Sequence, residues 1–264
     1  MRLTCVTLAL VVAVVLAACT SASRTPRAAP PRPALATTTA PVPASTTTTS
    51  APAPSPTTRP ARPGTSAAVA PAASAFHSSV TTIDAATAAT MTSSWRPGCP
   101  VALSDLRVLT LSYWSFDRAS HDGRLVVNSR AAQPLTTAFR RLFDLRFPIE
   151  RMQPIDAYGG DDDASVAADN TSAFNCRPPD GGGGWSEHAY GLAVDVNPLR
   201  NPYVHADGTV KLAVSRPWVD RSQQAPGMLH AGDPVVGAFA SIGWGWGGSW
   251  SGLRDYQHFS ANGH

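Results

Sequence analysis

The stretch WSEHAYGLAVDVNP, residues 185–198, places His188 and Asp195 seven positions apart. Within it, residues 191–197 alternate so that the leucine and the two valines share one face of a predicted strand, with Asp195 on the opposite face. A carboxylate flanked by apolar neighbours is costly to bury unless its charge is compensated. A metal ion would compensate it, as would an ion pair or a hydrogen-bonded turn, and this stretch alone leaves these alternatives open.

The segment 243–259, GWGWGGSWSGLRDYQHF, adds Asp255 and His258 among glycines and aromatic residues. A catalytic zinc ion takes three protein ligands from His, Asp and Glu and keeps one position for water. His188, Asp195 and His258 meet that requirement, which predicts one Zn²⁺ per chain. Asp255 remains as a nearby carboxylate that can take a proton from the attacking water and return it to the leaving amine.

Three short motifs follow one another along this part of the chain. They read Ser186-x-His188-x-x-Gly191-x-Ala193-x-Asp195, then Gly243-Trp244-x-Trp246-Gly247-Gly248, then Asp255-Tyr256-x-His258-Phe259. Together they resemble the zinc D-alanyl-D-alanine carboxypeptidase family, which includes VanY-type carboxypeptidases, D-Ala-D-Ala dipeptidases and L-alanyl-D-glutamate endopeptidases. The resemblance runs from roughly residue 103 to residue 259.

The resemblance implies a role for each matching residue. His188, Asp195 and His258 match the zinc ligands, and Asp255 matches the general acid/base, a place often held by glutamate in relatives. Arg177 matches an arginine that holds the substrate or stabilises the oxyanion. The alternative for Arg177 is a salt bridge made from a loop beside a disulfide.

Two further residues are expected to contact substrate. Ser186 precedes the first histidine of the motif and orients its loop rather than attacking a carbonyl, because no Gly-x-Ser-x-Gly elbow is present. Trp246 can stack on a sugar ring or a peptide. Its alternative is to brace a glycine-rich loop against the core, which is the commoner use of such a tryptophan.

The pattern of apolar residues predicts an α+β fold. We expect a single compact zinc-peptidase domain with a small, mainly antiparallel central sheet and flanking helices, preceded by a disordered tether. Strand-like runs lie at 106–111 and 125–127, and helices are expected at about 128–148 and 233–243. The first helix would be capped by Asn128 or Ser129, carry Pro134 in its first turn and end at Pro148, and the second would stop at Gly243.

The N-terminal 18 residues are predicted to be a lipoprotein signal peptide. Arg2 precedes an apolar run shorter than the ~20 residues of a spanning helix. The run ends in Leu16-Ala17-Ala18-Cys19, which resembles the bacterial lipobox and implies a lipid anchor on Cys19. An ordinary secretory signal is the alternative, and both place the mature protein outside the cytosol, the first on the bacterial cell membrane.

Residues 19–75 are rich in Ala, Pro, Thr and Ser, have no acidic residue and are expected to form a disordered tether. Six of the 21 basic residues precede residue 76, whereas all 18 acidic residues follow it, which leaves residues 76–264 with a net charge of −3. The weakly basic character of the whole chain therefore gives no reason to expect nucleic acid as a partner. Residues 76–264 are the predicted catalytic domain, with its core at about 101–260.

Two cysteines remain after the signal peptide and Cys19 are set aside, namely Cys99 and Cys176. In an oxidising compartment two such residues favour a disulfide over free thiols or zinc ligands. The sequence therefore predicts a bridge between Cys99 and Cys176.

The resemblance implies a metallopeptidase that cuts peptidoglycan stem peptides, with D-alanyl-D-alanine carboxypeptidase activity as the first choice and a monomer as the expected form. L-alanyl-D-glutamate endopeptidase action on the same polymer is one alternative. A zinc-stabilised cell-wall-binding module without catalysis is another, and its signature would be the loss of a ligand or of the proton-transfer residue. All four of these residues are present.

Overall fold

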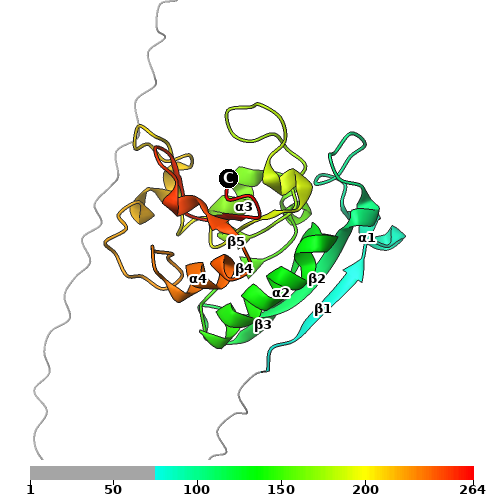
Figure 1. Cartoon of the computed structure of the whole chain (residues 1–264), viewed down its shortest axis with the longest axis horizontal. Coiled ribbons are helices and arrows are strands. Elements are labelled where there is room, and N and C mark those ends of the chain that lie inside the picture. The colour runs from blue at the N-terminus through cyan, green and yellow to red at the C-terminus, as the bar shows by residue number, and fades with distance from the viewer. Residues whose placement is uncertain (1–74) are drawn as a thin grey trace, which may run out of the picture. The chain divides into compact units, whose positions relative to one another are not determined.

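A long hairpin forms the centre of the first sheet in the computed structural model, which describes residues 75–264. The hairpin consists of β2 (Leu106–Trp114) and β3 (Ser120–Asn128), and β1 (Ser78–Thr82) pairs antiparallel with β2 to give the order β1-β2-β3. Figure 1 shows these three strands side by side, with α2 (Ser129–Asp144) lying along one face. The signal peptide, the Cys19 anchor and the tether up to residue 74 lie outside the described residues.

Helix α2 begins directly where β3 ends. The Asn128 side chain caps it by accepting a hydrogen bond from the Arg130 N–H, as predicted. Counted from Ser129, the first residue of the helix, Pro134 lies in the second turn, so the prediction of a first-turn proline is wrong. The apolar face of α2 packs on the sheet through buried residues that include Leu135 and Phe139.

The end of α2 also differs from the prediction. The helix stops at Asp144, before Pro148, because Arg146 adopts a left-handed conformation with φ 51°. The Arg146 N–H donates to the Phe143 carbonyl and the Phe147 N–H donates to the Leu142 carbonyl, the paired hydrogen bonds of a Schellman motif. Backbone hydrogen bonding therefore ends the helix before the proline can.

A second sheet carries the C-terminal motifs. It consists of β6 (Ala193–Asp195), β10 (His258–Ser260) and β8 (Gly245–Trp246), all antiparallel, in the order β6-β10-β8. Helix α4 (Pro234–Ala240) packs against this sheet through Phe239, whose ring stacks on that of Phe259 at 3.9 Å between centroids. After α4 the chain turns at Gly243, with φ 82°, as predicted.

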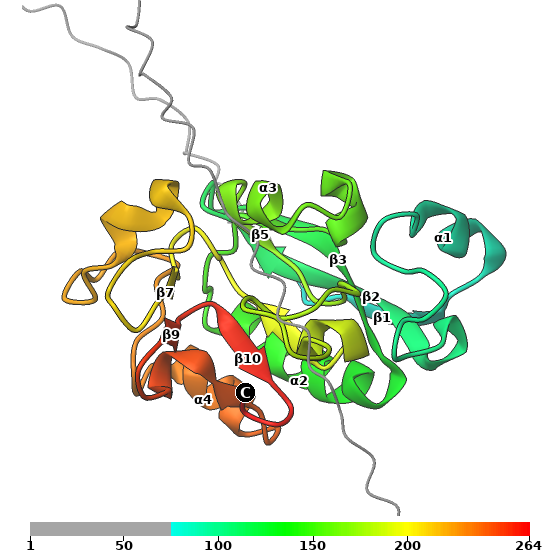
Figure 2. The same ribbon diagram turned by 90° about the horizontal axis from the view of Figure 1, so that it is seen from above.

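Short elements complete the domain, and Figure 2 shows α1 and α4 at opposite ends of it. The remaining elements are α1 (Ala85–Thr90), α3 (Asp162–Ala167), the parallel pair β4 (Arg151–Met152) and β5 (Asn170–Thr171), the antiparallel pair β7 (Tyr203–Val204) and β9 (Arg254–Asp255), and 3-10 turns at Leu103–Asp105, Ile155–Tyr158, Glu187–Tyr190, Ala213–Trp218 and Gly247–Ser249. The predicted α+β class is confirmed, although the strands divide among four small sheets. None of the helices in residues 75–264 is long and apolar enough to cross a membrane.

One hydrophobic core joins the two larger sheets. Leu125 from β3, Phe139 from α2, Val194 from β6 and Phe259 from β10 are all buried in it. Phe139 also meets the α4 residue Phe239 edge to face at 6.0 Å. The strands that carry the C-terminal motifs therefore rest on the same packed interior as the long hairpin, which gives them a rigid support.

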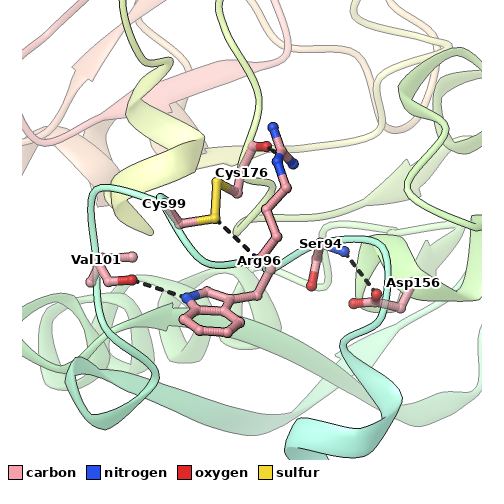
Figure 3. The surroundings of a disulfide bond; sticks show 7 residues. Ser94, Arg96, Cys99, Val101, Asp156 and Cys176 are labelled. Atoms are coloured by element: carbon pink, nitrogen blue, oxygen red, sulfur yellow. Dashed lines mark hydrogen bonds between the residues drawn. A yellow bond between two sulfur atoms is a disulfide. The ribbon is translucent and has the colours of Figure 1, made fainter.

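The predicted disulfide is confirmed and joins Cys99 to Cys176 across 77 residues (Figure 3). The Arg96 guanidinium donates to the Cys176 carbonyl at 2.8 Å, and the backbone N–H of Ser94 donates to the carboxylate of Asp156 at 2.9 Å. With the pairing of β1 and β2, these contacts fix residues 76–100 to the rest of the domain.

We expect the double variant Cys99→Ser, Cys176→Ser to lose about 2–4 kcal/mol of unfolding free energy, because the bridge closes a long loop in the unfolded chain. Denaturant titration of the wild type and the variant measures this loss. Reduction of the wild type should lower its stability by the same amount and leave the variant unchanged. Equal midpoints for the oxidised wild type and the variant would contradict the expectation.

Candidate metal centre

His188 is positioned by a tight turn that follows a serine. The Ser186 hydroxyl accepts a hydrogen bond from the His188 N–H at 3.3 Å and so caps the 3-10 turn Glu187–Tyr190. The turn ends at Gly191, which has φ 66° and packs so closely that an added Cβ would lie 2.6 Å from the backbone nitrogen of Asn128. Only glycine fits both demands, which accounts for the glycine between the motif's histidine and its aspartate.

Asp195 and His258 are brought together by strand pairing. They are direct partners in the antiparallel ladder between β6 and β10, so their side chains point to the same side of the sheet. The Nδ1 of His258 lies 3.2 Å from Oδ1 of Asp195, and the Nε2 of His188 lies 3.2 Å from Oδ2. The two ring nitrogens are 3.2 Å apart. The three predicted ligands therefore form one cluster.

The outer nitrogen of each imidazole ring, on the side away from Asp195, also has a possible hydrogen-bond partner. Nδ1 of His188 faces the Ala173 carbonyl at 2.5 Å, and Nε2 of His258 faces the backbone oxygen of His264 at 3.4 Å. Both outer partners are oxygens that only accept, so each outer nitrogen can carry the ring proton, and in that tautomer each inward nitrogen presents a lone pair. Two lone pairs and a carboxylate converge in a site where each residue is at most 6% exposed.

Such a cluster of acceptors suits a metal ion. The three possible ligand atoms all lie within 4.8 Å of one another. Without a cation or an added proton these atoms repel one another in a buried site, whereas a divalent ion satisfies all three. Two imidazoles and one carboxylate form a donor set typical of catalytic zinc, and a hydrogen bond to the outer nitrogen of each ring is the usual support of a histidine ligand. The residues present therefore fit a metal.

Asp255 lies beside the cluster and is not part of it. It belongs to β9 and is 7% exposed, and its Oδ1 has no hydrogen-bond partner among the described residues. Burial, with a further contribution from the negative charge of Asp195, raises the pKa of Asp255 to about 7. Burial also opposes ionisation of Asp195, but protonated imidazoles at His188 and His258, which take the place of a cation when none is bound, outweigh it and hold the pKa of Asp195 well below its usual range. Two carboxyls in one site with pKa values pushed apart suit different roles, one as a fixed charge and one as an acid/base.

A cavity of about 330 Å³ opens onto the cluster. The cluster and Asp255 line it, together with Arg177, Trp185, Lys211 and Trp250. Trp185 is 37% exposed, whereas Trp250 is fixed in place because its indole N–H donates to the Gly263 carbonyl at 2.6 Å. The wall therefore combines charged and aromatic groups around the possible metal position.

The structure shows the alternative that was expected for Arg177. Its guanidinium lies 3.0 Å from the Asp162 carboxylate, directly after the disulfide residue Cys176. Lys211 contacts the same carboxylate at 2.8 Å. Arg177 also lines the cavity, and its Nε has no partner among the described residues. Contact with substrate stays a prediction for this residue.

The two residues predicted to contact substrate occupy different places. Ser186 lines the cavity, and its hydroxyl caps the turn that carries His188, in keeping with an orienting role. Trp246 does not line this cavity. It is 7% exposed, its indole N–H donates to the Tyr256 carbonyl at 2.8 Å, and its ring packs near that of Phe259. This placement favours the bracing alternative for Trp246.

Several residues that line the cavity were not predicted as site residues, among them Trp185, Lys211, Trp250 and Gln257. Trp185 and Gln257 lie inside or next to the motifs, where a residue adjacent to a ligand was a signal that could have found them. Lys211 is the only lysine of the chain, but this unusual composition does not indicate where the residue lies in the fold. Trp250 lines the cavity because of the conformation of its loop, which a pattern of apolar residues in the sequence does not predict.

A family model described as D-alanyl-D-alanine carboxypeptidase matches residues 180–261. The matched segment contains the three residues of the cluster and Asp255, and it confirms the resemblance of these motifs to the zinc peptidase family. No curated protein and no solved structure matches the chain significantly. The match supports a hydrolase of the metallopeptidase class.

We expect alanine at His188, Asp195 or His258 to weaken zinc binding by more than about 100-fold, since even residues that only support a ligand change metal affinity by about 10- to 100-fold. Competition with a chromophoric chelator measures the affinity. In the wild type, zinc at 100 times its dissociation constant should add about 2.7 kcal/mol of stability. His121→Ala is the matched control, because this histidine pairs with Asp117 outside the cluster. Wild-type affinity in the three alanine variants would refute the site.

Proposed function

We propose that this protein is a zinc metallopeptidase that hydrolyses peptidoglycan stem peptides, with D-alanyl-D-alanine carboxypeptidase activity as its principal reaction. One observation carries the proposal: His188, Asp195 and His258 direct three acceptor atoms toward one point in a cavity that Asp255 also lines. The family match over residues 180–261 supports the same class of chemistry. The choice of substrate rests on the family description, because a fold or a motif alone does not determine specificity.

Zinc, Asp255 and Arg177 would each have a separate role in hydrolysis of the peptide bond. When bound, zinc supplies a Lewis acid and lowers the pKa of water to about 7. Asp255 accepts the proton of the attacking water and returns it to the departing nitrogen of the substrate. Arg177 donates from its guanidinium to the oxygen of the scissile group, where negative charge develops. Burial of the cluster excludes competing water and strengthens each of these interactions.

Two alternatives are outcomes of the same test. L-alanyl-D-glutamate endopeptidase action would use the same residues and differ only in how the stem peptide lies in the cavity. A wall-binding module without catalysis would need no proton-transfer residue and could lose a ligand. The presence of Asp255 and of all three ligand residues argues against the binding module.

We also propose that the protein acts outside the cytosol, as a monomer tied to the membrane by a lipid on Cys19. The support is the sequence Leu16-Ala17-Ala18-Cys19 and the Ala/Pro/Thr-rich stretch that follows it. A bacterial surface is also where a peptidoglycan substrate would be met.

The deciding experiment incubates purified protein with defined muropeptides and identifies the products by mass spectrometry. Carboxypeptidase action releases the terminal D-alanine, and endopeptidase action cuts beside the sugar-linked alanine. A chelator should abolish cleavage and added zinc should restore it. Intact muropeptides under every condition would reject both peptidase functions and favour the binding module.

We expect Asp255→Ala to reduce the turnover number by at least about 100-fold, the lower range of the contribution of a general acid/base, while zinc stays bound. Turnover is measured on the same muropeptides and zinc by chelator competition. Asp220→Ala, at an exposed aspartate, should leave both unchanged. A fully active Asp255→Ala protein would remove this residue from the mechanism.

A further inference from the structure

Gln257 lies between Asp255 and His258 in the sequence, and its side chain contacts the predicted metal ligand Asp195. Its side chain is buried, with 5% of the residue exposed, and it forms part of the cavity wall. The Gln257 carbonyl accepts the Val196 N–H at 3.0 Å, which fixes the backbone beside the end of β6. Its side-chain Nε2 donates to Oδ2 of Asp195 at 3.3 Å.

The orientation of this amide follows from its partner. A carboxylate only accepts hydrogen bonds, so the amide nitrogen of Gln257 faces Asp195 and the amide oxygen points away. That oxygen, Oε1 of Gln257, is buried and has no hydrogen-bond partner among the described residues. An unpaired buried acceptor costs on the order of 1–3 kcal/mol. Gln257 is therefore a poor choice for stability alone.

The hydrogen bonds of the Asp195 carboxylate indicate what Gln257 contributes to the site. Among residues 75–264, the side chains that reach its carboxylate are His188, His258 and Gln257. In the tautomer that binds a metal, both imidazoles present lone pairs on this side, because their protons lie on the outer nitrogens that face the Ala173 and His264 oxygens. Gln257 is consequently the one true donor to this carboxylate in the described part of the chain.

We propose that Gln257 is a positioning residue, whose amide N–H holds the Asp195 carboxylate in the orientation that binds the metal, at a cost in stability. The inference rests on the metal site of the proposed function and adds a residue to it. A carboxylate that is free to rotate must be ordered when the ion binds, whereas one already held by a hydrogen bond has lost that freedom in advance. Loss of the donor should therefore appear in metal affinity.

The test compares two substitutions that each remove a buried unpaired oxygen. Gln257→Met keeps an unbranched side chain of similar length and removes both the donor and the unpaired acceptor. Ser260→Ala is the matched control, since Ser260 lies three residues after Gln257 and is fully buried. Its Oγ has no hydrogen-bond partner among residues 75–264 and so makes no hydrogen bond to the cluster. Zinc affinity is measured by chelator competition, and the stability of the metal-free proteins by denaturant titration.

We expect Gln257→Met to bind zinc about 10- to 100-fold more weakly than the wild type. Its metal-free stability should stay close to that of the wild type, because removal of the unpaired acceptor offsets the loss of the hydrogen bond to Asp195. Ser260→Ala should keep wild-type zinc affinity. This split between affinity and stability is the signature of a positioning role, because a merely structural residue would lose stability first.

Three results would overturn the inference. Zinc affinity of Gln257→Met within twofold of the wild type would show that the hydrogen bond does not orient Asp195. A fall in metal-free stability alongside the weaker binding would assign Gln257 a structural role. A wild type that binds no zinc would remove the metal site and both proposals with it. A wild type that binds zinc but cleaves no muropeptide would reject the peptidase function alone. The zinc affinity of Gln257→Met would then still decide whether Gln257 positions Asp195.

Discussion

The convergence of three acceptor atoms in a buried site is the constraint on which the rest of the domain depends. Like partial charges held 3.2 Å apart cannot be kept together by their own interactions. The geometry must be imposed from outside, by elements stable enough to resist the repulsion until a cation relieves it. Two of the three side chains are fixed by one antiparallel register, that of β10 against β6. The third is fixed by a capped turn that ends at Gly191.

Packing behind the cluster supplies that resistance. Phe259 lies next to the ligand His258 in β10 and stacks on Phe239 of α4, which in turn contacts Phe139 of α2. Gly191 lies against the backbone at the start of α2, so the turn that carries His188 is held by the same helix. The long hairpin and α2 are thus the base on which the site is built, although neither supplies a ligand.

Local sequence predicted a large part of this arrangement. Alternation in 191–197 left several roles open for Asp195, and the ligand requirement of zinc together with the order of the motifs led to His188, Asp195 and His258, which the fold brings together. The disulfide followed from counting cysteines. The α+β class and the starts of both longer helices followed from capping residues and periodicity.

What could not be predicted depends on contacts between distant segments. The ion pair of Arg177 with Asp162 joins residues that no local pattern connects, and the burial of Trp246 depends on how the glycine-rich loop folds back. The end of α2 was misplaced because proline is a visible signal, whereas the left-handed Arg146 that ends the helix is not. The division into four sheets likewise depends on tertiary packing, which outweighs local preference.

The lysine in the cavity wall has a practical consequence. Lys211 is bridged by Asp162 and Asp180, at 2.8 Å and 2.9 Å; burial alone would lower its pKa, but these carboxylates raise it above the ordinary value. The ammonium therefore keeps its proton, and a protonated amine does not react with acylating reagents. Since the chain has no other lysine, acylation of a side-chain amine depends on how often these ion pairs break and release the amine. The rate of acylation at Lys211 would therefore report on the local stability of the ion pairs beside the cavity.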